Sequence, residues 1–384
     1  MQVADFIDGK SGRLVQTDRG YLAYIPNPLE PGIDLSLSMV KQLSEADRAL
    51  SELAGIARTL LNPHLLIGPF IRREAVLSSR IEGTQASFSD LLFFEAARLR
   101  EKEVPDVREV SNYVQALEYG LAGLSTLPVS LRLVREIHQR LMAGVRGESH
   151  TPGEFRRSQN WIGPAGCSLA EATFVPPPVK EMLDALDAFE KYLHAPSEMP
   201  ALIRLALIHY QFEAIHPFLD GNGRVGRLLV TLLLCAENLL PQPLLYLSAY
   251  FERHRDDYYR NLLAVSQKGA WEEWIRYFLR AMAVQSADAI RKIDRLLALR
   301  QAYRERLQQA RASALLLQLI DDLFGNPALT NPSVCERMGI TPRSAQLNIN
   351  KLVEKGVLKE ATGRQRNRMY VATEIVDIIE RQET

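Results

Sequence analysis

The residues from His216 to Arg227, HPFLDGNGRVGR, combine a histidine, an aspartate, three glycines and two arginines in twelve positions. The apolar run LLVTLLLCA follows directly and is typical of a buried helix. A helix that begins near Asn222 leaves the N–H groups of its first turn without partners, and its dipole is positive there. Gly221 and Gly223 carry no side chains that would shield these N–H groups. The pattern therefore predicts a cradle for a phosphate.

The charged residues of the same stretch suit phosphoryl or nucleotidyl transfer. His216 is neutral near pH 7 and can accept the proton of an attacking hydroxyl. Arg224 and Arg227 lie three positions apart, so we expect them to project from one helix face toward the same ligand. Asp220 is placed to hold a Mg²⁺ ion that bridges phosphates. Each residue alone fits an ordinary turn or ion pair, but the combination predicts a site.

Composition narrows the class of protein. The 384 residues are 47% hydrophobic and 24% charged, which predicts an ordinary core and two or three domains. Lys and Arg together number 46, as do Asp and Glu, which argues against a global attraction to nucleic acid or membrane. Three distant cysteines predict free thiols in a reducing compartment. The first residues lack the apolar core of a signal peptide, and no apolar run is long enough to span a bilayer. We expect a cytoplasmic protein without a membrane partner.

Helical periodicity dominates the chain from Ser36 to about residue 310. It is interrupted at Pro63, at residues 145–178, and around Pro241 and Pro243. The first 35 residues are rich in Gly and Pro, with a single strand-like piece at 21–26.

Two strand-like pieces, 159–162 and 173–175, lie within the second interruption. They predict an isolated β-hairpin in an otherwise helical protein. Because a lone hairpin is only marginally stable, we expect it to be braced by the helices or by a bound segment.

The last part of the chain has a different character. An amphipathic helix (312–323) is followed by a short helix, a turn at Gly339, a second helix from about Thr341 to Lys355 capped by Gly356, and a strand–turn–strand wing. The expected fold is thus mainly α, with a helical core, a small β-hairpin and a C-terminal winged helix-turn-helix. The predicted parts are an N-terminal segment (1–100), a catalytic core (101–290), a helical connector (291–310) and the winged-helix domain (311–384).

A winged helix-turn-helix is typical of DNA-binding proteins. Residues 330–372 carry eight Lys or Arg against three Glu. Arg343, Gln346 and Asn350 suit contacts to base edges, and the wing arginines Arg364, Arg366 and Arg368 suit phosphates. Winged helices also serve protein contacts or dimerisation, so duplex DNA, a protein and a second copy of the chain all stay open as partners.

The twelve residues resemble the signature of the Fic family, His-Pro-Phe-x-(Asp/Glu)-Gly-Asn-Gly-x-x-x-Arg, at every specified position. The similarity extends to residues 202–234 as core helix, loop and helix, and to 245–265 as the following helices. Residues 153–178 resemble the family's flap, the name used for this segment below. Roughly residues 1–290 are covered.

This resemblance implies that the loop binds ATP and Mg²⁺, and that AMP passes to a Ser, Thr or Tyr hydroxyl of a target protein with release of pyrophosphate. It implies that His216 is the general base, that Asp220 holds the Mg²⁺, and that the flap around Trp161, Ile162 and Gly163 aligns the target as an added strand. The implied nucleotide-binding residues are Gly221, Asn222, Gly223, Arg224, Gly226, Arg227 and, in the adenine pocket, Tyr258.

A second stretch, SSRIEGT, resembles the inhibitory signature (Ser/Thr)-x-x-x-Glu-(Gly/Asn) of the family through Ser78, Glu82 and Gly83. Ser78 and Glu82 are four residues apart and share one helix face. In such family members the glutamate pairs with the second motif arginine, here Arg227. A guanidinium held by a carboxylate cannot also hold a γ-phosphate. The resemblance thus implies an autoinhibited enzyme with an N-terminal inhibitory helix.

Other functions stay open at the level of sequence. The same site could remove AMP, with Glu82 positioning a water molecule, or could transfer other phosphate-containing groups. Alternatively, the chain could be a DNA-binding regulator in which the catalytic core is secondary.

Overall fold

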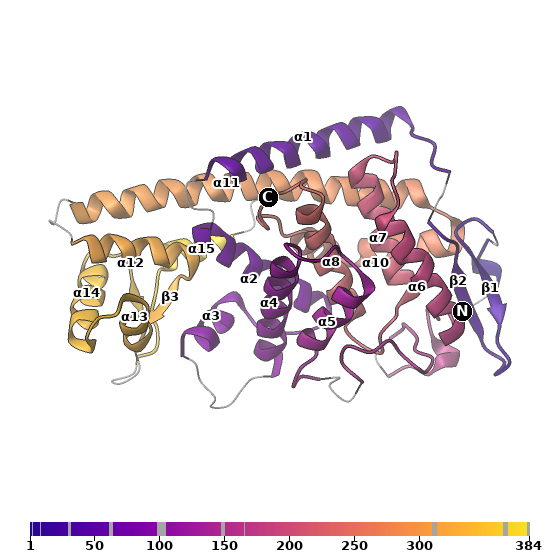
Figure 1. The fold of residues 1–384 in the computed structure, drawn as a ribbon, viewed down its shortest axis with the longest axis horizontal. Helices are drawn as coiled ribbons and strands as arrows, with labels where there is room; N and C mark the ends of the chain where they lie inside the picture. The colour runs from indigo at the N-terminus through magenta and orange to yellow at the C-terminus, as the bar shows by residue number, and fades with distance from the viewer. Residues whose placement is uncertain are drawn as a thin grey trace.

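The computed structural model describes residues 1, 3–7, 9–29, 32–60, 64–97, 105–146, 150–164, 166–308, 313–363 and 368–381. These parts of the chain are mainly α-helical, as the periodicity predicts. Figure 1 shows an elongated molecule, with the N-terminal strands at one end and the C-terminal helices α12–α14 at the other. None of the described helices combines the length and the apolar character that a membrane crossing requires.

A short 3₁₀ turn (Val3–Asp5) and a two-stranded antiparallel sheet open the chain. Strand β2 (Leu22–Pro26) confirms the strand predicted at 21–26, and it pairs with β1 (Gly12–Gln16), with Gly12 opposite Pro26. The sequence analysis missed β1. Its five residues carry little periodic signal, because the pairing with β2 and not local propensity defines the strand.

One long helix, α11 (Trp271–Gln308), runs along most of the molecule, and α1 (Leu37–Thr59) lies beside part of it (Figure 1). Helix α1 begins at Ser36, whose hydroxyl accepts the Met39 N–H. Helix α11 runs in the same direction, because Ser36 contacts Glu272 and Gln42 contacts Arg276. The boundary predicted at residue 290 falls inside α11, so one continuous helix joins the core to the predicted connector. The domain boundaries themselves stay a prediction.

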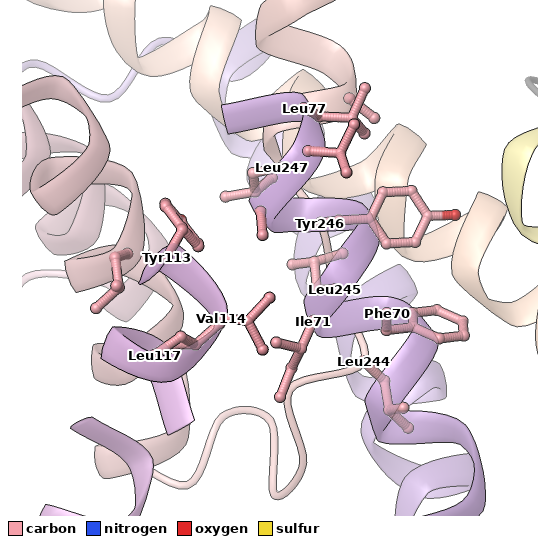
Figure 2. Packing of buried hydrophobic residues seen from close by; sticks show 14 of the residues in the cluster. Phe70, Ile71, Leu77, Tyr113, Val114, Leu117, Leu244, Leu245, Tyr246 and Leu247 are labelled. Carbon is pink, nitrogen blue, oxygen red and sulfur yellow. The ribbon is translucent and has the colours of Figure 1, made fainter. Parts of the chain in front are cut away.

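Helix α2 (His64–Ile81) is central to the packing. Figure 2 shows its apolar side chains, such as Phe70 and Leu77, near Tyr113 and Leu117 of α4 (Pro105–Gly123) and near the apolar segment 244–247. All of these side chains are buried. Helices α3 (Phe88–Ala97) and α5 (Leu131–Leu141) also pack against α4. The close packing of α2 fixes the position of its last turn, which carries Ser78.

The helices around the motif are α6 (Val179–His194), α7 (Ala201–Ile215), α8 (Asn222–Ala236), α9 (Ser248–Arg253) and α10 (Arg255–Lys268). Helices α7 and α8 are buried on nearly all sides, which explains their continuous apolar sequences. The breaks predicted at 145–178 and around Pro241 are confirmed.

The flap contains less β-structure than the sequence predicts. Among the described residues of the flap, only Ile162 and Phe174 form a bridge, and a 3₁₀ turn (Leu169–Glu171) lies between them. Strand β2 braces the second arm, because the Tyr24 N–H donates to the Val175 carbonyl at 2.9 Å. The brace is thus a strand from the start of the chain, where a helix or a bound segment was expected.

The C-terminal region contains α12 (Ala314–Gly325), β3 (Ala328–Thr330), α13 (Asn331–Met338), α14 (Pro342–Glu354), β4 (Lys359–Glu360), β5 (Met369–Val371) and α15 (Thr373–Glu380). The sheet order is β3-β5-β4 and all pairs are antiparallel. The predicted helix, turn at Gly339 and second helix are present, whereas β3 and α15 were not predicted. Arg364 and Arg366 of the predicted wing lie outside the described residues.

Candidate active site

The loop between α7 and α8 is held in one shape by its own side chains. The Asn222 amide accepts from the Phe218 N–H at 2.8 Å and donates to the Phe218 carbonyl at 2.8 Å, while the Phe218 ring is buried. Gly221 has φ +79°, a left-handed conformation that favours glycine, and serves as the N-cap of α8. His216 also has a positive φ of 50°, which is uncommon for a side-chain-bearing residue and frequent at functional sites.

The imidazole of His216 is set up as a base. Its Nδ1 lies 3.2 Å from the carbonyl of Glu213, which can only accept, so Nδ1 carries the proton and Nε2 is left as the acceptor. Burial lowers the pKa of His216 to about 4, with a smaller opposing effect of that carbonyl. The side chain is therefore neutral at physiological pH.

His216 faces a cavity of about 660 Å³. The walls come from the end of α2, the flap, α7, the first turn of α8 and α10. Among the lining residues are Glu82, Trp161, Ile162, Gly163, His216, Gly223, Arg227, Tyr258 and Tyr259. The cavity thus brings together the base, the start of α8, one motif arginine and the flap.

Glu82 lies directly at the start of α8. Its Oε1 is 2.6 Å from Nη2 of Arg227, and a Cβ atom on Gly223 would lie only 2.3 Å from the same oxygen. The carboxylate therefore covers the helix N-terminus that was predicted to hold a phosphate. Burial alone would raise the pKa of Glu82, but Arg227 outweighs it and holds this pKa below the ordinary value.

Ser78 completes the contact. Its hydroxyl accepts from Arg227 Nε at 2.9 Å and its carbonyl accepts from Nη2 at 3.0 Å, so three oxygens from α2 and the turn after it surround one guanidinium. Gly83 has φ +98° and ends the segment, with its N–H donating to the Arg80 carbonyl. We call the contact between Glu82 and Arg227 the Glu82 pair.

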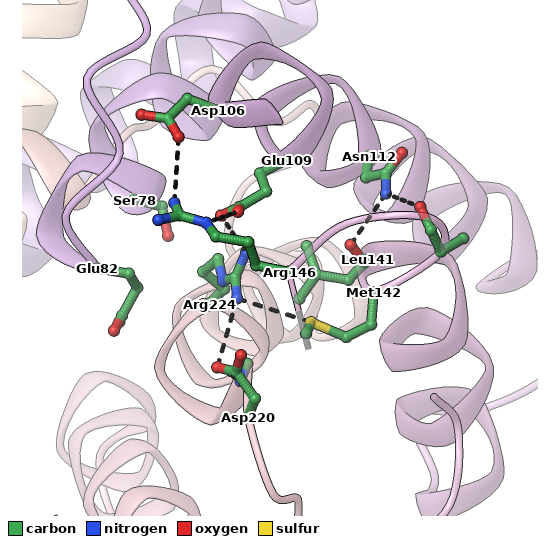
Figure 3. Close-up of polar contacts among 12 residues, drawn as sticks. Ser78, Glu82, Asp106, Glu109, Asn112, Leu141, Met142, Arg146, Asp220 and Arg224 are labelled. Carbon is green, nitrogen blue, oxygen red and sulfur yellow. Dashed lines mark hydrogen bonds and ion pairs between the residues drawn. The ribbon is translucent and has the colours of Figure 1, made fainter. Parts of the chain in front are cut away.

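Arg224 does not lie where the sequence analysis expected it. Its guanidinium points away from the cavity lining toward α4, where Nη1 lies 3.1 Å from Oε2 of Glu109 (Figure 3). Nη2 lies 3.6 Å from the sulfur of Met142 and 3.6 Å from Oδ1 of Asp220. Arg224 and Arg227 are neighbours on α8, yet the carboxylates of Glu109 in α4 and of Glu82 in the turn after α2 hold them apart.

Asp220 can hold a Mg²⁺ ion only as one ligand among several. Its carboxylate is 43% exposed, and Oδ1 accepts the Gly221 N–H at 2.6 Å. Within the described part of the chain, no three His, Cys, Asp or Glu side chains gather as a preformed metal site. A single carboxylate fits Mg²⁺, which is commonly bound through one or two carboxylates, with the remaining positions filled by phosphates and water.

Comparison with known proteins identifies a family that two segments of the chain match. Residues 40–122 match the model of the Fic/DOC family N-terminal region, and residues 128–234 match the model of the Fic/DOC family itself. The chain belongs to the Fic/DOC family. The matched segments include α1, α2, α4 and the whole motif loop, and thus both partners of the Glu82 pair.

Curated relatives of the Fic domain carry the name protein adenylyltransferase Fic. Those of Drosophila ananassae and Drosophila virilis are each 28% identical over 179 residues, or 46% of this chain. The match spans about a third of the length of these relatives, 32% and 33%.

Solved structures show the same fold. A Fic family protein from Desulfovibrio desulfuricans superposes with a TM-score of 0.58 at 18% identity, covering 92% of this chain and all of that chain. Fic-1 from C. elegans superposes with a TM-score of 0.51 at 18% identity, covering 67% of this chain and 74% of that chain.

Helix α10, which follows the matched Fic segment, places Tyr258 in the cavity wall. The neutral His209 below it has Nδ1 3.2 Å from the Gly226 carbonyl, so the Tyr258 hydroxyl donates to His209 Nε2 at 2.8 Å. Tyr258 is buried, whereas its neighbour Tyr259 is 41% exposed and lines the same cavity. Tyr259 thus offers a more accessible ring face, and the sequence analysis did not single it out.

Gly226 lies behind the Fic cavity, where α7 and α8 touch. A Cβ atom there would lie 2.4 Å from Oε1 of Glu213, so the glycine permits the close approach of the two helices. Glu213 lines the cavity, burial raises its pKa to about 7, and its Oε1 has no hydrogen-bond partner among the described residues. The sequence analysis missed this carboxyl, whose signal is an acid within the apolar run that leads to His216.

The flap of the Fic domain is tied to the motif loop by a residue that the sequence analysis also missed. Arg156 is buried, and its Nε donates to the His216 carbonyl at 3.0 Å while Nη2 donates to the Pro177 carbonyl. Trp161 and Ile162 remain 41% and 38% exposed at the cavity mouth, next to Gly163. The predicted flap residues thus line the mouth of the cavity.

Proposed function

We propose that this protein transfers AMP from ATP to a hydroxyl group of a target protein, and that Glu82 restrains the transfer. The observation that carries the proposal is the shared cavity, in which His216, the N-terminus of α8 at Gly223 and Arg227 face the same space. The printed name of the Drosophila relatives, protein adenylyltransferase, supports the same activity.

The residues of the chain have separate tasks in this reaction. His216 accepts the proton of the target hydroxyl through Nε2, and the hydroxyl oxygen then forms a bond to the α-phosphorus. The bond between the α-phosphorus and the bridging oxygen breaks, and the N–H groups at the start of α8 hold the charge of the departing pyrophosphate. A Mg²⁺ ion held by Asp220 and the phosphates would neutralise part of this charge.

Glu82 opposes this arrangement in two ways. Its carboxylate lies against the first turn of α8 at Gly223, and it also holds Arg227. A phosphate oxygen would therefore have to replace the carboxylate at the helix N-terminus and at the guanidinium. Glu82 is 33% exposed and lies next to Gly83, where a small backbone change would move the carboxylate away. The proposed resting state of the protein is therefore inhibited.

A labelling experiment with a cell lysate tests the activity. ATP labelled at the α-phosphate should label one or more proteins, whereas ATP labelled at the γ-phosphate should not. His216→Ala should remove the label. Label from the γ-phosphate would instead indicate a kinase, and labelling that persists in His216→Ala would contradict the proposed base.

The exposed edge of Glu82 also favours a second reaction at the same site. A carboxylate in the cavity, next to a neutral histidine, could orient a water molecule for the removal of AMP from a modified protein. Incubation of a labelled target with wild type and with Glu82→Gln distinguishes the two directions. Release of AMP that requires Glu82 would make removal the physiological reaction.

Binding of duplex DNA through α14 is a separate proposal. Arg343, Asn350 and Lys351 are exposed on this helix, whereas Gln346 is engaged with Asn350 and with the Tyr370 hydroxyl. The full chain should bind a duplex with a steep salt dependence, which Arg343→Ala and Lys351→Ala should reduce. Absence of any salt-sensitive binding would favour protein contacts or a homodimer at this helix.

A further inference from the structure

Both arginines of the motif are held by carboxylates, and the second carboxylate belongs to neither sequence motif. Glu109 of α4 contacts Arg224 of α8 with 3.1 Å between Oε2 and Nη1, and each side chain is 4% exposed (Figure 3). We call this contact the Glu109 pair. Since a buried charge is costly without a partner, neither side chain can easily leave the other.

The surroundings of Glu109 hold it in place. Its Oε1 accepts from Arg146 Nε at 2.7 Å, and Arg146 also reaches Asp106 at 3.2 Å. One turn further along α4, Asn112 donates to the carbonyls of Leu141 and Ala143 and fixes the segment from which Arg146 comes. Glu109 therefore sits in the second turn of α4, between two guanidiniums and without a glycine next to it in the sequence.

Among the described residues, Arg224 also forms a longer ion pair with Asp220. Its Nη2 lies 3.6 Å from Asp220 Oδ1, beyond hydrogen-bond distance but within easy reach of a small rotation. If Glu109 were neutral, the buried guanidinium would be drawn to Asp220 as the nearest remaining carboxylate. That closer contact would add a second donor to Oδ1, which already accepts the Gly221 N–H, and would place a positive charge against the carboxylate that is expected to face a cation.

We propose that Glu109 is a positioning residue, which keeps Arg224 from tightening its 3.6 Å contact with Asp220 and so leaves the Asp220 carboxylate available to the Mg²⁺ ion that accompanies the nucleotide. The inference rests on the proposed function, in which ATP and Mg²⁺ bind at this loop. Glu109 acts through Arg224 and Asp220, as outer-shell partners of metal ligands commonly do.

The test measures Mg²⁺-dependent binding of a fluorescent, non-hydrolysable ATP analogue to the full chain. Glu82→Gly serves as the background, because it clears the start of α8. Adding Glu109→Gln should raise the Mg²⁺ concentration at half-saturation by about 10- to 100-fold, the usual effect of losing an outer-shell partner. Saturating Mg²⁺ should restore binding of the analogue, which a merely structural defect would not allow.

Arg146→Gln is the matched control. It removes a charge from the same network, at a side chain that is 63% exposed, but leaves the Glu109 pair intact. The Mg²⁺ dependence should stay as in the Glu82→Gly background. A shift as large as that of Glu109→Gln would overturn the proposal, because the effect would then follow the net charge and not the position of Arg224.

Glu109→Asp keeps the charge and shortens its reach, and it decides the question if Glu109→Gln does not fold. The half-saturating Mg²⁺ concentration should rise in this variant too, by a smaller factor. An unchanged Mg²⁺ dependence in a folded Glu109 variant overturns the proposal. So does an increase in transfer like that of Glu82→Gly, since Glu109 would then be a second inhibitor. If Glu82→Gly transfers no AMP at all, the proposed function fails, while the binding measurement still tests Glu109.

Discussion

The Glu82 pair and the Glu109 pair join the same two residue types to the same helix, yet their settings differ. Glu82 is 33% exposed and sits in the turn after α2, beside Gly83. Glu109 is 4% exposed and sits within α4, between Arg224 and Arg146. The first carboxylate can leave its arginine for water, whereas the second is buried between two guanidiniums.

This difference indicates that the burial of the carboxylate, and not the presence of an ion pair, determines whether the contact can be exchanged. An exposed carboxylate recovers its hydration when it moves away, so a phosphate can replace it at modest cost. A fully buried carboxylate loses its partner without gaining water, so the contact persists. We therefore expect the Glu82 pair to regulate the site and the Glu109 pair to organise it.

The largest effect on AMP transfer is expected when the general base, His216, is replaced. In a Glu82→Gly background, His216→Ala should lower AMP transfer by ~10² to 10⁴-fold, because the proton acceptor is lost. Transfer of the α-phosphate label checks the loss. Binding of the non-hydrolysable analogue should persist as the control, since the start of α8 is unchanged.

Removing the releasable carboxylate is expected to have the next largest effect. Glu82→Gly should raise transfer by roughly 5- to 150-fold, the range of a typical coupling free energy. Adding Arg227→Ala should cancel the gain, because the freed guanidinium would no longer exist. Equal transfer by wild type and Glu82→Gly, with a competent target present, would show that Glu82 does not restrain the site.

The two pairs should also differ in their contribution to stability. Glu109→Gln should lower the free energy of unfolding by about 3 to 5 kcal/mol, because it leaves a buried guanidinium without its main partner. Glu82→Gln should cost less, because Glu82 is partly exposed and two Ser78 oxygens still accept from the buried Arg227 guanidinium. Urea denaturation of both variants measures the difference, and equal losses would remove the distinction between the pairs.

The smallest expected effect is on the pKa of His216. The charge of Glu82 raises this pKa while burial lowers it to about 4, so Glu82→Gln should lower it further. Glu109→Gln should leave it nearly unchanged, because Glu109 is neutralised by Arg224 and Arg146. NMR titration of the histidine ring, assigned with His216→Ala, gives the values. A titration near the ordinary 6.5 in wild type would contradict the buried, neutral imidazole.

The sign of the accompanying stability change follows from the lowered pKa. In the unfolded chain His216 has its ordinary pKa of 6.5, whereas in the folded protein its pKa is about 4. As the pH falls, the unfolded chain therefore takes up the proton first. The neutral imidazole thus stabilises the folded state above pH 6.5. This contribution to the free energy of unfolding is lost as the pH falls from 6.5 to 4.

The amino-acid sequence determined the features that depend on local chemistry. Ser36 marks the start of α1, Gly339 ends α13, and Gly221 and Asn222 shape the start of α8, because caps and turns are formed by residues next to one another. The Glu82 pair was also expected, but only through the resemblance to a family with two spaced motifs.

Tertiary structure decided the contacts between distant segments. The helical spacing placed Arg224 beside Arg227, but only the packing of α2 and α4 around α8 sends the two guanidiniums to different carboxylates. Contacts between distant segments also decided the pairing of β1 with β2 and the reduced pairing of the flap. They likewise decided the hydrogen bond from Arg156 to the His216 carbonyl. Hydrophobic periodicity predicts which face of a helix is buried. Which side chains of other helices contact that face depends on how the helices pack.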